Sequence, residues 1–482
     1  MGEYQSFHCS VLGFKHGPPC QDSSICLDEG RIHIAVTADG HGDHNCFRSY
    51  LGARAACRIT QTALLSFAKT LEESGREKEL FEEKRGKELI THLFENILGT
   101  WTEKVTGHAL KNPPTEEELS GAEENTAAVY RQNDWLQHMY GTTLIAALMT
   151  DRYLLMLHQG DGRCTVIHAD GSLSQPVPWD SRCYDVYTTS LCDEDASSSW
   201  RHALIDLRQD PVIAVLCSSD GIEDSFNKSM ERLDAYFKDL MADFVDEGKE
   251  HFMATLVPHF SSMSEYGSRD DITLSAILDA DALAPLRDRY RLEAKRTEKE
   301  IEFRAASGRL EDMDYKANYL EQQVRDAEEV CARMKKEADR GRGLFENLRE
   351  SDAKEEKHTL ALEEAKRKLE KAKQERDEYA KLHEEVMERA AAAQKELERL
   401  DGELAVLMGL KERALPSGEA ATPARPAEQE NEAARRVTFD EEADMIFEEL
   451  ITEAIERNRA VPEKAPASSE DETEETTEKK EV

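Results

Sequence analysis

The chain has 482 residues and a formal net charge of −37 at pH 7. A field of this sign repels nucleic acid and anionic membranes, so we expect neither as a general partner. The longest apolar stretch, Thr142 to Met149, is too short for membrane insertion. The first residues lack a basic start followed by an apolar run, and the ten cysteines include no CxxC pair. These features favour a cytoplasmic protein with reduced thiols and disfavour a zinc site.

Composition divides the chain into three regions. Residues 1–283 combine strand and helix patterns with turn glycines and all four tryptophans, which predicts a globular domain. Residues 284–412 are nearly free of proline and dense in Glu, Lys, Arg, Ala and Leu, as is typical of a coiled coil. Residues 413–482 are rich in Pro, Ser, Thr, Ala and acids, the composition of a disordered acidic tail.

The first clear strand pattern lies at residues 32–38, where isoleucine and valine alternate with other residues. This alternation predicts a strand with one buried face, and the turn at 28–30 predicts a hairpin with the apolar run before it. Residues 49–71 have the pattern of an amphipathic helix. Residues 72–138 are charged and helix-prone, and we interpret them as further helix plus a surface insertion.

Three apolar runs, TTLIAALMT, YLLMLHQ and CTVIHA, follow one another between residues 142 and 169 with short turns between them. This spacing predicts an antiparallel meander. Residues 211–219 form a buried strand that precedes a helix through about Glu247, and residues 272–278 form the last strand. Short strands joined by turns, with helices before and after, predict the α+β class, with antiparallel sheets covered by helices.

Four aspartates stand at the ends of separate predicted strands: Asp39, Asp161, Asp220 and Asp270. Acids in these positions converge if the strand ends pack together, and clustered carboxylates need a counter-charge such as a divalent cation. An all-oxygen ligand set, including the Gly40 carbonyl, suits Mg²⁺ or Mn²⁺. Two such ions about 3.5–4 Å apart would share a water and lower its pKa towards ~7, giving a hydroxide that attacks a phosphate ester.

Each of these residues has a plainer interpretation when it is taken alone. An Asp-Gly pair such as that at Asp161 is usually a turn, and a single histidine such as His41 is more often structural. The order of four acids on strand ends within one domain is what favours a metal site.

Four stretches of the globular region carry distinctive motifs: CQDSSICLDEGRIHIAVTADGHGD, YGTTLIAALMTDRYLLMLHQGDGR, AVLCSSDGIEDSF and GSRDDITLSAI. In order and spacing they resemble the motifs of the PPM-type (type-2C) metal-dependent Ser/Thr protein phosphatases, and GFKHGPPCQDS resembles a bacterial branch of that family. The resemblance covers roughly residues 5–280. It implies a four-layer α-β-β-α sandwich of two antiparallel sheets flanked by helices, with a two-metal site at one end.

The resemblance also implies a set of metal ligands. Asp39 would bridge both ions, and Gly40 would contribute its carbonyl. Asp220 and Asp270 would complete the shell of the first ion, while Asp22 would hold waters on the second.

Further roles follow from the same resemblance. Asp161 and Asp224 match a pair that binds a third, weaker ion in some members. His41 matches the residue proposed as general acid to the leaving alkoxide. The phosphate-binding arginine of the animal enzymes has no clear counterpart, and Lys15 and His16 are the nearest candidates for substrate binding.

The sequence departs from the family pattern at three positions. Gln21 stands where many members have Glu, and Asp43 replaces the second glycine of the DGHGG pattern. Asp271 replaces the usual Asn, so that either Asp270 or Asp271 is a potential ligand; we choose Asp270. These changes bear on substrate affinity more than on metal binding.

A heptad-like spacing runs through the second region. Residues three and four apart are Leu362, Ala365, Leu369, Ala372, Arg376, Tyr379, Leu382, Val386, Ala390, Ala393, Leu397, Leu400, Leu404 and Leu407, of which all but Arg376 are apolar or aromatic. The pattern favours a self-associating or folded-back coiled coil over a single solvated helix, and Gly341 and Gly343 suggest a hinge or hairpin. In the tail, residues 439–458 form a short amphipathic helix that either docks on a partner or folds back on its own chain.

Together these features predict a cytoplasmic, Mn²⁺- or Mg²⁺-dependent enzyme that hydrolyses phosphoserine or phosphothreonine in proteins. The coiled coil would set the oligomeric state or the choice of partner. Two alternatives stay open: a catalytically weak phosphatase-like scaffold that acts through its coiled coil, and a mainly structural coiled-coil protein.

Overall fold

The computed structural model describes residues 3–184, 187–344 and 352–409. These residues form two compact units, one of residues 4–225 and 255–278, the other of residues 226–254 together with those after 278. None of the helices in the described ranges is long and apolar enough to cross a membrane. The predicted helix at 439–458 and the acidic tail lie outside the described residues, and the boundary at 283/284 stays a prediction.

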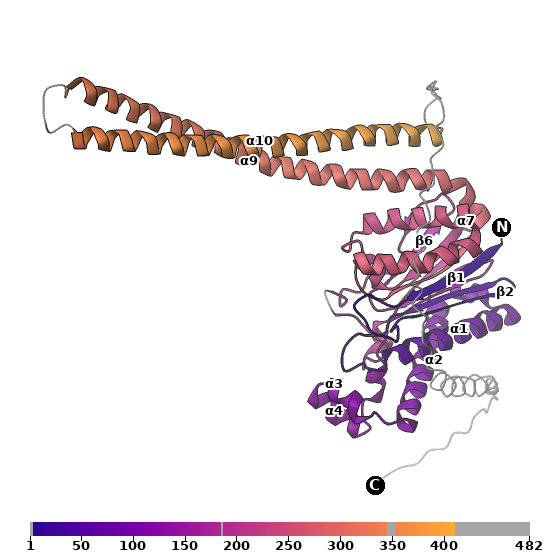
Figure 1. Cartoon of the computed structure of the whole chain (residues 1–482). Coiled ribbons are helices and arrows are strands. Elements are labelled where there is room, and N and C mark those ends of the chain that lie inside the picture. Colours follow the sequence, from indigo (N-terminus) through magenta and orange to yellow (C-terminus); the bar gives the residue numbers. More distant parts are fainter. Residues whose placement is uncertain (1–2, 185–186, 345–351, 410–482) are drawn as a thin grey trace, which may run out of the picture. The chain divides into compact units, whose positions relative to one another are not determined.

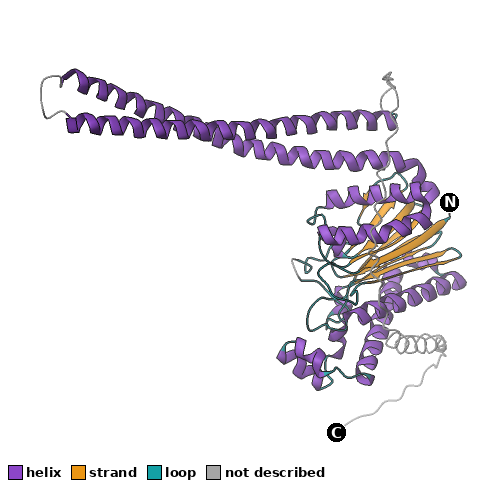
Figure 2. Cartoon of the chain, viewed as in Figure 1, coloured by secondary structure: helices purple, strands orange, loops and turns teal. Residues whose placement is uncertain are grey.

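The sheet-containing unit is built from two five-stranded antiparallel sheets, ordered β1-β10-β9-β6-β7 and β2-β3-β4-β5-β8 (Figure 2). The strands are β1 Tyr4–Val11, β2 Ser23–Glu29, β3 Ile32–Ala38, β4 Leu144–Met149, β5 Tyr153–Gln159, β6 Arg163–His168, β7 Leu173–Ser174, β8 Arg201–Asp206, β9 Val212–Ser218 and β10 Ile272–Asp279. The helices are α1 Ser49–Ser74, η1 Glu77–Phe81, α2 Glu83–Lys111, α3 Glu116–Gly121, α4 Glu124–Arg131, η2 Leu136–Tyr140, α5 Ala196–Ser199, α6 Asp220–Asp224, α7 Met230–Tyr266, α8 Ala280–Leu283, η3 Ala284–Leu286, α9 Arg287–Leu344 and α10 Asp352–Leu407. The predicted α+β class with two antiparallel sheets flanked by helices is confirmed.

The central strands are buried on both faces. Every residue of β3, β4 and β5 is buried, because one face of this sheet packs on helices and the other faces the second sheet. Thr37 of β3 donates a hydrogen bond to the carbonyl of Cys217 in β9, and its Oγ1 lies 2.8 Å from Ser275 Oγ in β10. The expectation of a single buried face for residues 32–38 was therefore wrong.

The predicted meander breaks after its second strand. β4 and β5 pair antiparallel as expected, but β6 pairs with β9 and β7 in the other sheet, and β8 lies beside β5 instead. The turn at residues 160–162 carries the chain from one sheet to the other, with Gly160 at φ +105°, a conformation that other residues rarely adopt. The meander was predicted wrongly because a short Gly-rich turn has the same sequence features whether the next strand pairs in the same sheet or crosses to the other sheet.

Helices cover both outer faces of the sandwich. α1 and α2 lie over the β2-β3-β4-β5-β8 sheet, and residues 255–266 of α7 lie over the other (Figures 1 and 2). The fully buried indole of Trp101 in α2 donates a 3.0 Å hydrogen bond to the Gly52 carbonyl in α1. Much of the segment 72–138 therefore belongs to the core rather than to a surface insertion.

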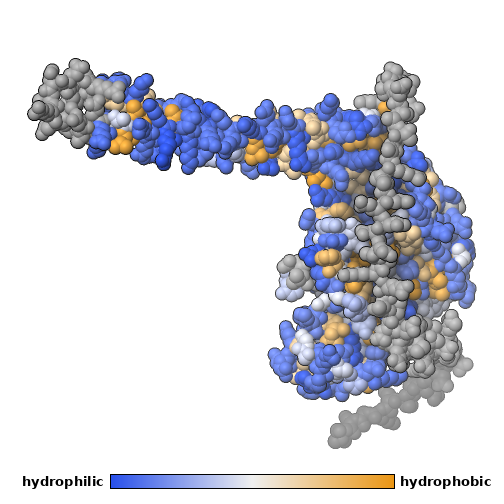
Figure 3. Space-filling view, in the orientation of Figure 1, coloured by the Kyte–Doolittle hydropathy of each residue, from blue (hydrophilic) through white to orange (hydrophobic). Residues whose placement is uncertain are grey.

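In the second unit, α9 and α10 run side by side as a folded-back helical pair (Figure 1). The buried seam includes Ala306, Met313, Val324, Ala365, Val386, Ala390, Ala393 and Leu400. Ion pairs cross between the helices at Arg296–Asp401 (2.6 Å) and Arg389–Glu302 (2.9 Å). The outer surface in view is mainly hydrophilic (Figure 3). Of the arrangements left open by the heptads, the structure shows the folded-back one.

Candidate metal centre

Antiparallel pairing gathers the acids at one end of the sandwich. The end of β3 pairs with the start of β2 (Ala38 opposite Ser23), and the end of β9 pairs with the start of β10 (Ser218 opposite Leu274). The acids that lie within two residues of these strand ends, or of the end of β5, are Asp22, Asp39, Asp161, Asp220 and Asp270. Strand direction and register bring neighbours within each sheet together, and the packing of the two sheets brings the two sets together.

The negative charges of these carboxyl groups raise one another's pKa values. Burial raises the pKa of Asp39, and the charges of Asp22, Asp220 and Asp161 raise it further. Burial and then the charge of Asp161 raise the pKa of Asp220 to about 7, although a hydrogen bond with Asp39 opposes the shift. Burial also raises the pKa of Asp22. Without a counter-charge, the cluster holds protons that ordinary aspartates have lost at neutral pH.

The cluster fits a hard divalent cation by its chemistry. The Asp39 and Asp220 carboxyl groups lie close enough to shift each other's pKa, and two carboxyl groups this close can hydrogen-bond only when they share a proton. In the described part of the chain, Asp22 Oδ2 is buried without a hydrogen-bond partner. Within those same residues, no three His, Cys, Asp or Glu side chains already surround a common point. The acids lie close together and their negative charges are not fully compensated. All their potential metal-binding atoms are oxygens, which suits Mg²⁺ or Mn²⁺.

The loop that carries Asp39 is held by close backbone packing. The Asp39 N–H donates to Thr143 Oγ1 at 3.0 Å, and the Asp39 carbonyl accepts from the Thr143 N–H at 2.8 Å. A Cβ at position 40 would lie 2.5 Å from the carbonyl oxygen of Gln21. Gly40 is thus required by packing against the loop that carries Asp22, whereas its role as a carbonyl ligand stays a prediction.

The adjacent acids Asp270 and Asp271 have different environments. Asp271 is buried and accepts hydrogen bonds from the backbone N–H groups of Gly13 (2.6 Å) and Gln21 (2.7 Å). Asp270 is half-buried, and its charge contributes to the raised pKa of Asp220. Asp270 accepts only the N–H of its neighbour Asp271, at 3.0 Å, among the backbone donors of the described residues, and its role as the ligand stays a prediction.

Two basic side chains, Lys15 and His16, stand beside this pair. Lys15 Nζ lies 2.6 Å from Asp270 Oδ2. His16 Nδ1 lies 3.2 Å from Asp271 Oδ1, and this hydrogen bond raises the pKa of His16. The two residues predicted to bind substrate are therefore neighbours of the acid cluster, although no contact with a phosphate is tested.

His41 lies on the same loop as Asp39. Its backbone N–H donates to the Gly141 carbonyl at 3.0 Å. Burial, followed by the charge of His138, lowers the pKa of His41 to about 4, and Asp43 opposes this shift. The imidazole is therefore neutral at neutral pH in the absence of another negative group.

Comparison with known proteins identifies the family. Residues 14–257 match the family described as Protein phosphatase 2C. The chain belongs to the protein phosphatase 2C family. This confirms the resemblance drawn from the four motifs, whereas no curated protein matches the chain.

Solved structures of bacterial phosphatases are similar to part of this protein phosphatase 2C chain. Stp1 from Staphylococcus aureus is 16% identical over 58% of this chain and 95% of its own, with a TM-score of 0.35. The serine/threonine phosphatase PstP/Ppp from Mycobacterium tuberculosis is 15% identical over 57% of this chain and 98% of its own, also with a TM-score of 0.35. A bacterial serine phosphatase is 14% identical over 58% of this chain and 98% of its own, with a TM-score of 0.36. The family assignment rests on the family match and not on these likenesses.

One ion pair near the acid cluster was not predicted from the sequence. Arg163 donates through Nε and Nη2 to both carboxylate oxygens of Glu223, at 2.6 and 2.7 Å, and its guanidinium lies 3.8 Å from the centre of the Trp179 ring. Arg163 follows Asp161 by two residues, and Glu223 immediately precedes Asp224. The pair thus joins the two segments that carry the predicted third-ion ligands. The available signal was an Arg and a Glu, each within two residues of a predicted ligand.

Proposed function

We propose that this chain is a Mn²⁺- or Mg²⁺-dependent phosphatase that hydrolyses phosphoserine and phosphothreonine in proteins. The observation that carries the proposal is the cluster of carboxyl groups at one end of the sandwich, whose pKa values are raised by burial and by one another. Membership of the protein phosphatase 2C family supports it. The ten free cysteines support a cytoplasmic location, where thiols stay reduced.

When bound, the ions would supply a water of lowered pKa as the nucleophile and neutralise charge on the phosphate. The residues that would hold two ions are Asp39, Gly40 through its carbonyl, Asp220, Asp270 and, through water, Asp22, with Asp161 and Asp224 for a weaker third ion. These side chains are acceptors only when ionised, so proton loss from the cluster accompanies metal binding.

Lys15 and His41 would act on the substrate. Lys15 now pairs with Asp270, and a cation on Asp270 would leave the ammonium available to the substrate phosphate. His41, with a pKa of about 4, would gain a proton for the leaving alkoxide only when a negative group such as a phosphate faces it. His16 is the second candidate for a phosphate contact.

The test is hydrolysis of a phosphothreonine peptide in Mn²⁺ by the wild type, Asp39→Asn and Asp220→Asn. Loss of a carboxylate ligand should lower kcat at least about 100-fold, because even an outer-shell partner is worth 10–100-fold. Asp210→Asn, which changes an acid paired only with His168 at 2.8 Å, is the matched control and should keep wild-type activity. Equal activity in all four proteins would overturn the metal mechanism.

The second candidate function is a catalytically weak phosphatase-like scaffold that acts through the α9–α10 pair. Asp43 favours it, because this exposed acid adds negative charge near His41 where an incoming phosphate would be repelled. Asp43→Gly discriminates the two functions. A large gain in turnover would show that Asp43 suppresses catalysis, whereas unchanged high activity would exclude the scaffold.

A further inference from the structure

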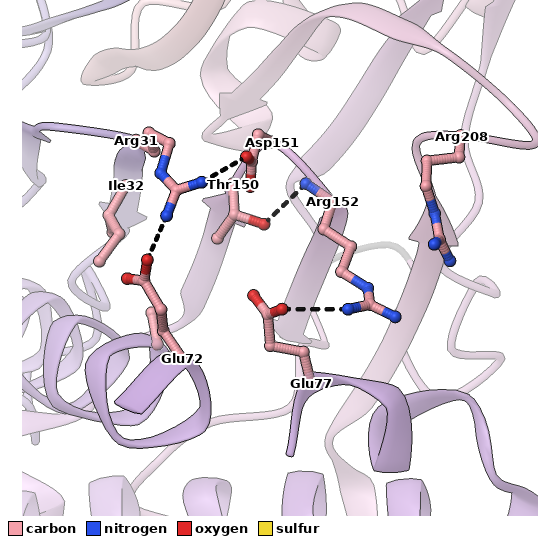
Figure 4. Close-up of a pocket in the computed structure, with 9 residues that line it drawn as sticks. Arg31, Ile32, Glu72, Glu77, Thr150, Asp151, Arg152 and Arg208 are labelled. Carbon is pink, nitrogen blue, oxygen red and sulfur yellow. Dashed lines mark hydrogen bonds and ion pairs between the residues drawn. The ribbon is translucent and has the colours of Figure 1, made fainter. Parts of the chain in front are cut away.

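A cavity of about 270 Å³ lies at the end of the β2-β3-β4-β5-β8 sheet opposite to the aspartate cluster (Figure 4). Ile32, in its wall, begins β3, whereas Asp39 follows the last residue of that strand. At roughly 3.3 Å per residue, the strand separates the two places by about 20 Å. None of the proposed metal ligands lines this cavity, so it requires an explanation of its own.

Arginines and acids alternate around the wall. Arg31 Nη1 donates to Asp151 Oδ2 at 2.8 Å, and Arg31 also pairs with Glu72. Arg152 Nη1 donates to Glu77 Oε2 at 3.2 Å. Apart from the contact between Arg152 and Glu77, these side chains are largely exposed. Each exposed ion pair contributes only about 0–1 kcal/mol to the free energy of unfolding. A ligand that replaces such a pair therefore loses little free energy.

Arg152 is bound less completely than its counterparts. Elsewhere in this unit, arginines that present both Nε and Nη2 to one carboxylate are Arg48, Arg76, Arg131, Arg163, Arg182 and Arg208. Among the described residues, the guanidinium of Arg152 hydrogen-bonds through Nη1 alone, and its Nε is buried with no hydrogen-bond partner. This edge of a guanidinium is the one that a planar carboxylate binds with two parallel hydrogen bonds.

A second buried polar atom near the cavity also lacks a partner. Tyr153 is fully buried, and its hydroxyl has no hydrogen-bond partner in the described part of the chain. Burial raises the pKa of this hydroxyl, and the charges of Glu77 and Glu72, both in the cavity wall, raise it further. Two unsatisfied polar atoms in one place are unusual for a folded protein, where such groups cost free energy unless a partner binds them.

The two ends of the cavity differ in charge. At one end, Arg31 lies between Glu72 and Asp151, one cation for two carboxylates (Figure 4). At the other end, Arg152 and Arg208 both lie near Glu77, and Arg208 is also held by an acid outside the wall. A lone anion would face the carboxylates of the first end, and a lone cation would leave the free N–H groups of the second end without an acceptor. A molecule with both charges matches both ends.

Part of the cavity wall is apolar. Ile32, which lies beside Arg31 and Glu72 (Figure 4), and Ala68 are buried wall residues that offer contact to a short hydrocarbon side chain. We propose that this cavity binds a small aliphatic α-amino acid, with its carboxylate against Arg152 and Arg208, its ammonium against Glu72 and Asp151, and its side chain against this apolar part of the wall. The site is independent of the proposed phosphatase activity.

The test is calorimetric titration of the full chain with L-leucine, L-leucinamide, N-acetyl-L-leucine and inorganic phosphate. L-leucine should bind saturably, and each analogue that lacks one charged end should bind at least about tenfold more weakly, because a charge-assisted hydrogen bond is lost. No saturable binding of L-leucine, or tighter binding of phosphate than of L-leucine, would overturn the proposal.

Two variants assign the ends of the ligand. Arg152→Gln should weaken L-leucine and N-acetyl-L-leucine about tenfold and leave L-leucinamide unchanged. Glu72→Gln, on an exposed side chain, should weaken L-leucine and L-leucinamide but not N-acetyl-L-leucine. Arg85→Gln, a surface change on α2 outside the cavity, is the matched control with wild-type binding. Equal weakening of all ligands by both variants would refute the assigned orientation, and an unchanged Tm of each variant without ligand shows that the fold is retained.

Discussion

The backbone N–H of Gly13 donates a 2.6 Å hydrogen bond to Oδ1 of Asp271, 258 residues later in the chain. Oδ2 of the same carboxylate accepts from the N–H groups of Gln21 (2.7 Å) and Asp22 (3.3 Å). Burial alone would raise the pKa of Asp271, but hydrogen bonds from His16 and the backbone lower it. Because the groups around it are donors, an ionised Asp suits this position better than the Asn of the family pattern.

Asp271→Asn should lower the free energy of unfolding by about 1–3 kcal/mol, because an amide –NH₂ would face donors that now have an acceptor. Urea unfolding of the metal-free protein measures this. Asp270→Asn is the matched control at the neighbouring, half-buried position. It should lose phosphatase activity while changing stability by no more than about 1 kcal/mol, the worth of an exposed pair. Equal stability of Asp271→Asn and the wild type would contradict the role given to the carboxylate.

The acid cluster should make metal-free stability depend on pH. The pKa of Asp220 is about 7 in the folded chain against an ordinary 3.8, so the folded state binds more protons between these values. The contribution of the protonated Asp220 carboxyl to the free energy of unfolding is fully present below the ordinary pKa and is lost as pH rises through about 7. In EDTA, Asp220→Asn should therefore match the wild-type Tm in acid and exceed it at neutral pH.

At neutral pH, Mn²⁺ should make the Tm of the wild type exceed that of Asp220→Asn, because the wild type binds the ion more tightly than the variant does. Thermal melts at several pH values, with EDTA or Mn²⁺, provide both comparisons. A Tm difference that does not change with pH in EDTA would show that Asp220 is not under electrostatic strain.

The sequence was enough to place the acids because each follows or precedes a strand whose apolar pattern is clear. The rule that antiparallel strands bring opposite ends together accounts for Asp22 beside Asp39 and for Asp220 beside Asp270, whereas the meeting of the two pairs depends on how the two sheets pack face to face. The crossing at Gly160 was not predictable, because the choice of sheet depends on which distant strand, β9 or β8, pairs with each neighbour. Pairings of this range depend on tertiary packing and leave no local pattern.

Contacts between residues that are far apart in the sequence also explain why the partners of Asp271 and Arg163 were not predicted. Asp271 is recognisable as a departure from the family, yet its role depends on Gly13, at the other end of the domain. Arg163 and Glu223 are ordinary surface residue types by composition and become a buried pair only because β6 and α6 meet at the crossing. The heptads predicted helix pairing, but the packing that decides between folding back and self-association acts between distant turns.

The Arg163–Glu223 pair should be important to both stability and activity. Glu223→Ala would leave the guanidinium of Arg163, whose side chain is 15% exposed, without its carboxylate, and this should cost about 1–3 kcal/mol, as for an unsatisfied polar group. The double change Arg163→Met with Glu223→Leu should cost less, because no buried charge then lacks a partner. Urea unfolding of the three proteins measures the order. If the single variant were as stable as the double, the pair would not be the buried interaction described here.

The last prediction concerns the seam of the α9–α10 pair. Leu400 is 1% exposed and Leu360 is 61% exposed, although both lie on α10. Leu400→Ala should destabilise the helical pair by about 2–5 kcal/mol, through lost burial and the cavity left behind. Leu360→Ala is the matched control and should stay within about 0.5 kcal/mol, as surface changes do. Thermal unfolding followed by circular dichroism of the full chain measures the helix loss. Equal effects of the two changes would contradict the folded-back packing, because in a separated helix neither leucine would be buried.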